Sequence, residues 1–303
     1  MHWARPVIGN SSSPARKRGI IVQLPVIVGV DGTSDSLLAV GWAADEARRL
    51  GAPLILLHGY EPSLLRDTGR EHQAAEHTLH GVLDWVRDHH ENVEVSAELV
   101  AQDEAELLTE RGREAQMIVL GSRRPGPVTG FLLGSVGLRV LSRAVRPVVL
   151  IRGGDADRST RKGEIVAGVP TEEDEAAVVL DFAFRTAAAH GVPLRVARAY
   201  GLPPAFTNES GVMGLSNRPG ELEREYRQEL TTFLKPWRRR HPEITVTEHI
   251  ELGFAAEMLV TLAARAQLLV VGRSSSTGSR YVGHVVHSTM HFANAPVAVV
   301  PTR

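Results

Sequence analysis

Short apolar runs alternate with longer amphipathic segments along most of the chain. Runs rich in β-branched residues, such as residues 25–30 and 53–59, predict buried strands, and the segments between them carry apolar residues at helical spacing. The predicted strands are residues 25–30, 53–59, 92–100, 116–121, 147–151, 164–169, 193–199, 243–252, 267–272 and 296–300. This alternation is typical of βαβ units, so we expect an α/β fold with a parallel sheet covered by helices.

The same order of elements occurs twice along the chain. Residues 41–60 align with residues 181–200, including a shared Gly-x-Pro-Leu sequence. Two further pairs of segments match in the same order, residues 114–123 with 265–274 and residues 146–151 with 295–300. We therefore expect a tandem duplication, in which each copy is a doubly wound, Rossmann-like parallel sheet of five strands.

Capping residues predict where several helices begin and end. Ser34, Asp103 and Thr171 precede helical runs and are expected to cap their amino termini. Gly51 and Gly191 follow two of these runs and are expected to end them.

Composition divides the 303 residues into two domains and flanking segments. We expect a disordered basic tail at residues 1–22, domains at residues 23–152 and 164–303, and a polar linker at residues 153–163. Residues 201–220 hold three prolines and four glycines, which fits either a mobile lid or a plain loop.

The charge balance and the lack of cysteine exclude several classes of function. Lys and Arg total 34 against 35 Asp and Glu, so no net positive field favours nucleic acid or anionic lipid. Without cysteine the chain has no disulfide framework and no thiolate site. No apolar run approaches the ~20 residues that a membrane span needs, so we expect a soluble, cytoplasmic protein without a membrane partner.

Candidate chemistry lies after the predicted strands, because ligands of open parallel sheets bind at the carboxyl ends of the strands. Asp31 follows the first strand, and a glycine-punctuated segment, residues 121–137, follows the fourth and leads into a helix near Gly134 or Ser135. Glycines permit close approach to a phosphate, and a helix amino terminus offers free N–H groups. This pattern favours an anion site, although such loops also occur as plain connections.

Both halves resemble the universal stress protein A (UspA) family, over residues 26–151 and 165–300. Nucleotide-binding members carry an aspartate after the first strand and the pattern Gly-x2-Gly-x9-Gly-Ser/Thr after the fourth. The first half supplies Asp31, Gly121, Gly134 and Ser135, and departs at Arg124, which stands in place of the second glycine. The resemblance implies an adenine-nucleotide alpha hydrolase-like fold.

The resemblance also implies an ATP site in the first half, with or without Mg²⁺. The implied residues are Gly29, Asp31 and Gly59 for the adenosine end, Gly121 for ribose and phosphate, and Gly134, Ser135 and Val136 for phosphate oxygens. Arg124 either pairs with a phosphate or fills the space that the family's glycine leaves for the nucleotide.

The second half has lost parts of this pattern. Pro170 stands where Asp31 stands in the first half, and the loop after Gly272 is shorter, so that Gly283 and His284 take the places of Gly134 and Ser135. We expect no ATP binding of the family's kind in this half, which would serve as a packing partner or regulator.

Motifs for catalysis and for metal binding are missing. The chain has no Gly-x-Ser-x-Gly elbow and no Walker lysine, so we expect no catalytic residues and at most weak ATP hydrolysis. His284, His287 and His291 share a helix face but lack an accompanying carboxylate, and we expect no metal there. His58 is interpreted as a buried structural histidine.

Two functions from different classes remain open. The first is a stress-response protein that binds ATP in its first domain as a regulatory or structural ligand, with the halves paired through residues 147–151 and 296–300 as a pseudo-dimer and with further homo-oligomerisation. The alternative is a nucleotide-free interaction scaffold for unknown protein partners, with two decayed sites. A third and weaker option is an enzyme with a substrate site in residues 201–220.

Overall fold

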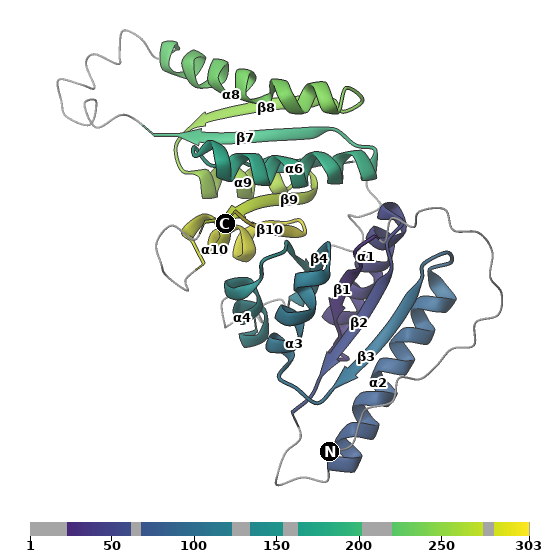
Figure 1. The fold of residues 1–303 in the computed structure, drawn as a ribbon. Helices are drawn as coiled ribbons and strands as arrows, with labels where there is room; N and C mark the ends of the chain where they lie inside the picture. The colour runs from purple at the N-terminus through teal and green to yellow at the C-terminus, as the bar shows by residue number, and fades with distance from the viewer. Residues whose placement is uncertain are drawn as a thin grey trace.

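Ten strands form one continuous sheet in the computed structural model, which describes residues 23–61, 68–122, 134–153, 163–201, 220–274 and 282–302 (Figure 1). Along the sheet the strands follow the order β3-β2-β1-β4-β5-β10-β9-β6-β7-β8. The strands are β1 (Val26–Gly29), β2 (Leu54–Gly59), β3 (Val95–Val100), β4 (Met117–Ser122), β5 (Val148–Arg152), β6 (Glu164–Gly168), β7 (Leu194–Tyr200), β8 (Val246–Leu252), β9 (Ala266–Arg273) and β10 (Val297–Pro301).

The sheet consists of two parallel halves that meet at one antiparallel pair. Strands β1–β5 form the first lobe and β6–β10 the second, and within each lobe all paired strands are parallel. The lobes join where β10 pairs antiparallel with β5, with Val149 opposite Ala298. The predicted tandem doubly wound α/β fold is confirmed, and so is the predicted junction along the fifth strands.

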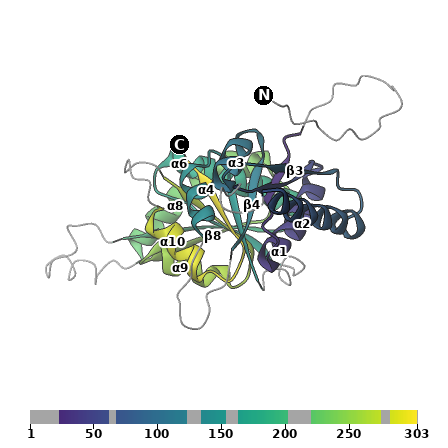
Figure 2. The ribbon, with the colours of Figure 1, turned by 90° about the horizontal axis from the view of Figure 1, so that it is seen from below.

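Helices cover both faces of the sheet, and each face has a hydrophobic core that runs through both lobes (Figures 1 and 2). One face carries α1 (Ser34–Leu50), α2 (Thr68–His89), α6 (Glu173–His190) and α8 (Glu221–Arg240); the other carries α3 (Glu104–Arg111), α4 (Ser135–Arg143), α9 (Ala255–Ala263) and α10 (His284–Phe292). A short 3₁₀ turn, Gly112–Glu114, follows α3. Among the described residues, no helix combines the length and apolarity that crossing a membrane demands.

Several predicted boundaries need correction by a few residues. Helix α1 is capped by Thr33 and begins at Ser34, and α6 follows Glu172, which makes no side-chain capping bond, in place of the expected cap at Thr171. Asp103 caps α3 as predicted, accepting from the N–H of Glu106. Strand β3 begins at Val95 and β8 at Val246, later than the apolar pattern indicated, because their first residues lie in turns and bends before the sheet.

Glycines end α1 and α6 in the predicted way. Gly51 and Gly191 adopt left-handed conformations with φ of 60° and 64°, and each N–H bonds to carbonyls of the last helical turn. Residues with a Cβ disfavour this conformation, whereas glycine adopts it at little cost. The chain therefore reverses at these glycines and enters β2 and β7.

Two arginines, buried Arg152 and half-buried Arg273, tie the lobes together beside the central strand pair. Arg152, at the end of β5, donates to the carbonyl oxygens of Ala293 and Thr289 at the end of α10, over 2.7 and 3.2 Å. Arg273, at the end of β9, donates to the carbonyl oxygens of Ser142 and Ala144 at the end of α4. Each lobe therefore caps a helix carboxyl terminus of the other, where a cation also complements the helix dipole.

Candidate functional site: a polar cleft at the carboxyl edge of the first lobe

The carboxyl ends of β1, β2 and β4 meet at one edge of the first lobe. Strand β1 pairs with β2 on one side and with β4 on the other, and chain connections leave β1 and β4 toward opposite faces of the sheet. This is the point where strand order reverses, and it is where open α/β sheets bind ligands.

The turn between β1 and α1 holds Asp31 in a fixed position. One carboxylate oxygen of Asp31 accepts from the backbone N–H of Thr33 over 2.9 Å and from its hydroxyl over 2.6 Å. The Thr33 hydroxyl oxygen accepts in turn from the N–H of Ser36, which caps α1. Gly32 between them has a φ of 76°, which favours glycine. Asp31 is thus exposed to solvent but oriented by the first turn of α1.

A cavity of about 360 Å³ opens beside Asp31. Its lining includes His58 and Tyr60 from the end of β2, and Ala75 and Thr78 from α2. The Tyr60 hydroxyl lies 2.9 Å from Nδ1 of His72 on α2. The volume is at the lower end of the range for small-molecule pockets, so it fits a nucleoside-sized group.

His58 contributes to this wall, in addition to a structural role. Its Nδ1 contacts the carbonyl oxygen of Val30, which fixes the ring against the end of β1. The side chain is half-buried and lines the cavity, so His58 is less buried than predicted. The difference arises because His58 is the second-last residue of β2, where α2 covers only part of the ring.

The start of α3 adds an acidic pair, of which the sequence predicted Asp103 only as a helix cap and did not single out Glu104. Burial, with the carboxylates of Asp31 and Asp103 nearby, raises the pKa of Glu104 to about 7, while Arg139 opposes this shift. Asp103 accepts from an Nη of Arg139 on α4 over 2.7 Å. Burial acts to raise the pKa of Asp103, but the hydrogen bonds from Arg139 and the Glu106 N–H outweigh it, so the pKa is lowered. At this edge of the lobe Asp103 is therefore ionised, and its neighbour Glu104 is half protonated near neutral pH.

Sequence reasoning misses Glu104 and Arg139 because the two residues lie on helices that are far apart in the chain. The only local signal is the run Asp103-Glu104 directly after a predicted strand. That run reads equally as an ordinary helix amino terminus with acidic residues in its first turn.

The three strand-end glycines allow close packing around the cleft. A Cβ on Gly121 would lie 2.5 Å from the carbonyl oxygen of Asp35, and one on Gly59 would lie 2.7 Å from Cα of Glu104. A Cβ on Gly29 would meet Leu120 and Leu108 at 3.1 and 3.3 Å. The glycines therefore let the first turns of α1 and α3 approach the strand ends, which brings Asp31 and Glu104 to the same edge.

The amino terminus of α4 lies at this edge as well. Gly134 is the N-cap residue and makes no side-chain capping bond, and no atom of the described residues lies within 4 Å of where its Cβ would be. Ser135 begins the helix and is exposed, and Val136 is half-buried against the core. The first N–H groups of α4 have no cap from their own N-cap side chain, which suits an anion.

The predicted site residues are thus distributed over one edge of the first lobe. Gly29, Asp31, Gly59 and Gly121 lie at the ends of three neighbouring strands. The Arg139–Asp103 bond links α4, which carries Gly134, Ser135 and Val136 in its first turn, to the α3 terminus next to Asp31. Arg124 lies outside the described residues, as do most of the glycine-punctuated segment and nearly all of residues 201–220.

The corresponding edge of the second lobe has different chemistry. Arg198, on β7, is buried and donates to the carbonyl oxygen of Pro170, the residue that replaces the aspartate. Burial lowers its pKa. Buried Glu175, in the first turn of α6, accepts from the hydroxyl of Ser274 after β9 over 2.7 Å. A carboxylate thus stands among the groups that would have to face phosphate in this lobe.

Histidines of α10 gather without forming a metal centre. The rings of His287 and His291 lie 4.1 Å apart, and burial together with His287 and Arg152 lowers the pKa of His291. Within the residues that the structure describes, no cluster of three or more histidine, cysteine or acidic side chains has the geometry to hold a metal ion.

The fold and this edge define a class: tandem α/β proteins of two Rossmann-like lobes with a polar cleft at the strand switch point. The sequence model of the universal stress protein family matches residues 24–152 and again residues 165–301. The chain belongs to the universal stress protein family.

Similar proteins support this assignment over nearly the whole chain. A universal stress protein of Mycolicibacterium smegmatis is 29% identical over 92% of this chain and 97% of its own length. Universal stress protein Rv2005c of Mycobacterium tuberculosis is 30% identical over 95% of this chain and 98% of its own length.

One solved structure shows the same architecture over most of the chain. A universal stress protein from Archaeoglobus fulgidus is similar in fold with a TM-score of 0.68, 16% identity, and coverage of 93% of this chain and 100% of that one. Another structure of an Archaeoglobus fulgidus universal stress protein, in complex with dAMP, is 26% identical over 43% of this chain and 99% of its own, with a TM-score of 0.36.

Proposed function

We propose that this stress protein binds ATP in the cleft of its first lobe and uses the nucleotide as a regulatory or structural ligand. The observation that carries the proposal is the position of Asp31. It is exposed at the switch point, oriented by two hydrogen bonds from Thr33, and lines a cavity of about 360 Å³. A fixed carboxylate in such a cavity suits the N–H and O–H donors of an adenosine group.

The phosphate end of the nucleotide would lie toward α4. The exposed start of α4, with no atom of the described residues within 4 Å of the Cβ position of Gly134, supplies N–H donors and the positive end of a helix dipole. Arg139 beside it is committed to Asp103 and so serves to hold α3 and α4 in register. In this arrangement Asp31 would accept hydrogen bonds from the adenosine group at one end of the cleft. The start of α4 would bind the phosphate groups at the other end.

Mg²⁺ is a possible companion of the nucleotide, and the cleft offers it oxygen ligands. Carboxylates of Asp31 and Glu104 are the hard donors that Mg²⁺ prefers, but the cation keeps most of its shell from water and phosphate. The raised pKa of Glu104 makes this residue a poor ligand below neutral pH. The protein's own contribution to a metal would then be small, so we assign no residue to it.

The second lobe serves as a partner for the first in this proposal. Pro170 offers no carboxylate, buried Arg198 takes the space beside it, and Glu175 would repel phosphate. The continuous sheet and the reciprocal arginine caps would transmit changes between the lobes. We include in the proposal a cytoplasmic location, further homo-oligomerisation, and ATP hydrolysis that is slow or absent.

Nucleotide content and a matched pair of variants test the proposal. Protein purified without added nucleotide is denatured and its supernatant analysed by chromatography, and ATP is then titrated into the nucleotide-free protein by calorimetry. Asp31→Ala should weaken ATP binding at least tenfold, because it removes the oriented carboxylate that would accept hydrogen bonds from the ligand. Asp84→Ala removes an exposed carboxylate from α2 and should leave binding unchanged.

The opposite results favour the scaffold function. Absence of released nucleotide together with no heat on ATP addition would contradict the proposal and leave a nucleotide-free interaction protein. Arg124→Gly then separates two causes: restored binding would show that the arginine side chain blocks the site.

A further inference from the structure

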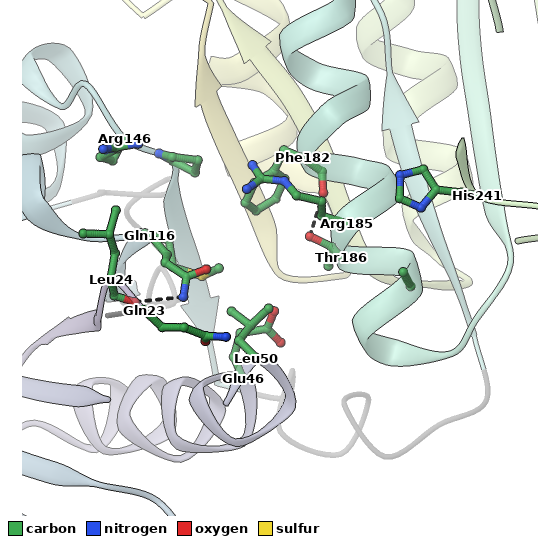
Figure 3. Close-up of a pocket in the computed structure, with 13 residues that line it drawn as sticks. Gln23, Leu24, Glu46, Leu50, Gln116, Arg146, Phe182, Arg185, Thr186 and His241 are labelled. Carbon is green, nitrogen blue, oxygen red and sulfur yellow. Dashed lines mark hydrogen bonds between the residues drawn. The ribbon is translucent and has the colours of Figure 1, made fainter. Parts of the chain in front are cut away.

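A second cavity lies between the lobes, at the opposite edge of the sheet from the cleft. Its volume is about 480 Å³. Gln23 and Leu24 precede β1, Met117 begins β4 and Pro147 precedes β5, so this wall is built at the amino ends of the strands. The facing wall comes from α6 of the second lobe, with Phe182 and Arg185 (Figure 3).

Glu46, on α1, is the buried polar group of this cavity. Its side chain is 1% exposed, and one carboxylate oxygen accepts from Nε2 of His190 across the lobe boundary over 2.7 Å. The same oxygen lies 3.5 Å from Arg49. The other oxygen, Oε1, has no hydrogen-bond partner among the residues that the structure describes. An unsatisfied buried acceptor destabilises the folded state, so a ligand N–H or O–H that reaches this enclosed oxygen would bind favourably.

Two arginines stand on facing walls of the same cavity (Figure 3). Arg146 uses its Nε for the carbonyl oxygen of Arg113, and Arg185 uses its Nε for that of Asp181. Within the described residues, the terminal nitrogens of both guanidinium groups are left for other acceptors. Their planar, forked arrangement suits the oxygens of a carboxylate, sulfonate or phosphate group.

The rest of the wall is mixed. Its apolar part is Leu24, Leu50, Met117, Pro147 and Phe182, and its polar part includes Gln23, Gln116, Thr186 and His241. A pocket of several hundred Å³ at a domain boundary, with an apolar lining and a few polar groups, is the usual form of a small-molecule site.

We infer that this cavity is a second ligand site, for an amphipathic organic anion that donates an N–H or O–H to Glu46 and presents its anionic group to Arg146 and Arg185. The apolar body of the ligand lies against Leu50 and Phe182. Because walls from both lobes hold the ligand, its binding stabilises the joined arrangement of the lobes. The site lies at the amino ends of the strands, so it is separate from the proposed nucleotide cleft and does not depend on it.

A fluorescent probe with these features tests the inference. Anilinonaphthalene sulfonate carries an aryl N–H, an apolar body and a sulfonate, and its fluorescence rises in apolar sites. It is titrated into the full chain carrying Phe254→Ser and Phe292→Ser, because these phenylalanines are 74% and 67% exposed and would attract dye on their own. We expect saturable binding with one site per chain that excess ATP does not displace.

Variants at the cavity decide whether the dye occupies it. Ala188 lines the mouth and is exposed on α6, so Ala188→Trp should fold normally and block entry. The double variant Arg146→Ala and Arg185→Ala should weaken dye binding about tenfold, in line with loss of charge-assisted bonds. It should leave the uncharged analogue phenylnaphthylamine unaffected. Arg48→Ala, an exposed arginine of α1 outside the cavity, is the matched control and should change neither.

Several outcomes would overturn the inference. These are dye binding that does not saturate, saturable binding that survives Ala188→Trp, and equal losses in the Arg48→Ala and the double variant. A fluorescence response that is missing altogether in the parent chain also overturns it. ATP binding by the same samples reports separately on the proposed function.

Discussion

At the scale of single residues, Glu104 makes the stability of the protein depend on pH. Its pKa is raised from 4.5 to about 7, so the folded state holds the proton more tightly than the unfolded chain. The stabilisation is therefore complete below about pH 4.5 and is lost as pH rises through about 7.

Glu104→Gln should remove this dependence. Since each pKa unit corresponds to about 1.4 kcal/mol and the group is only partly buried, we expect the variant to gain about 1–2 kcal/mol relative to the parent between about pH 5 and about pH 8. Urea denaturation at the two pH values measures the gain. Glu106→Gln, exposed on the same helix, is the control, and an equal offset for Glu104→Gln at both pH values would refute the assignment.

At the scale of elements, the turn before α1 couples the helix to the candidate site. The Thr33 side chain caps α1 and also donates to Asp31. Thr33→Ala should cost about 1–2 kcal/mol of unfolding free energy, as loss of an N-cap does, and should weaken ATP binding several-fold because Asp31 loses its anchor.

Ser34→Ala is the control for this turn, since it changes the adjacent first residue of α1 without removing the cap. Thermal melts and calorimetric titration with ATP measure both effects. If Thr33→Ala destabilises the protein and ATP affinity stays at the parent value, Asp31 does not need its anchor and the coupling is wrong.

The elements themselves follow closely from the sequence, and the cleft follows only in part. Apolar runs such as residues 54–57 and 268–271 are largely buried on both faces of the sheet. A continuous apolar run of this kind is typical of a strand in a parallel sheet. Asp31 is accessible from sequence because it directly follows such a run. Glu104 and Arg139 are not, because their proximity to Asp31 arises from the packing of α3 and α4 across a face of the sheet.

At the scale of the whole molecule, the two lobes share one sheet and both of its hydrophobic cores. Both hydrophobic cores continue across the β5–β10 pair, and Arg273 satisfies two carbonyl groups of the other lobe. The family resemblance implies the pairing of the fifth strands, whereas the arginine caps and the cavity at Glu46 depend on how the lobes meet and have no local signature.

Arg273→Met should leave the carbonyl oxygens of Ser142 and Ala144 without their donor and lower the unfolding free energy by about 2 kcal/mol. Burial lowers the pKa of this arginine, in agreement with its enclosed position. Denaturant titration gives the change, with exposed Arg113→Met as the control. A loss no greater than that of the control would mean that the caps contribute little to holding the lobes together.

The asymmetry between the lobes is the central claim, and the stoichiometry of ATP binding tests it most directly. Calorimetric titration of the nucleotide-free chain should give one ATP per chain, with binding lost in Asp31→Ala and kept in Glu175→Gln. No binding, or two equivalent sites per chain, would contradict the account.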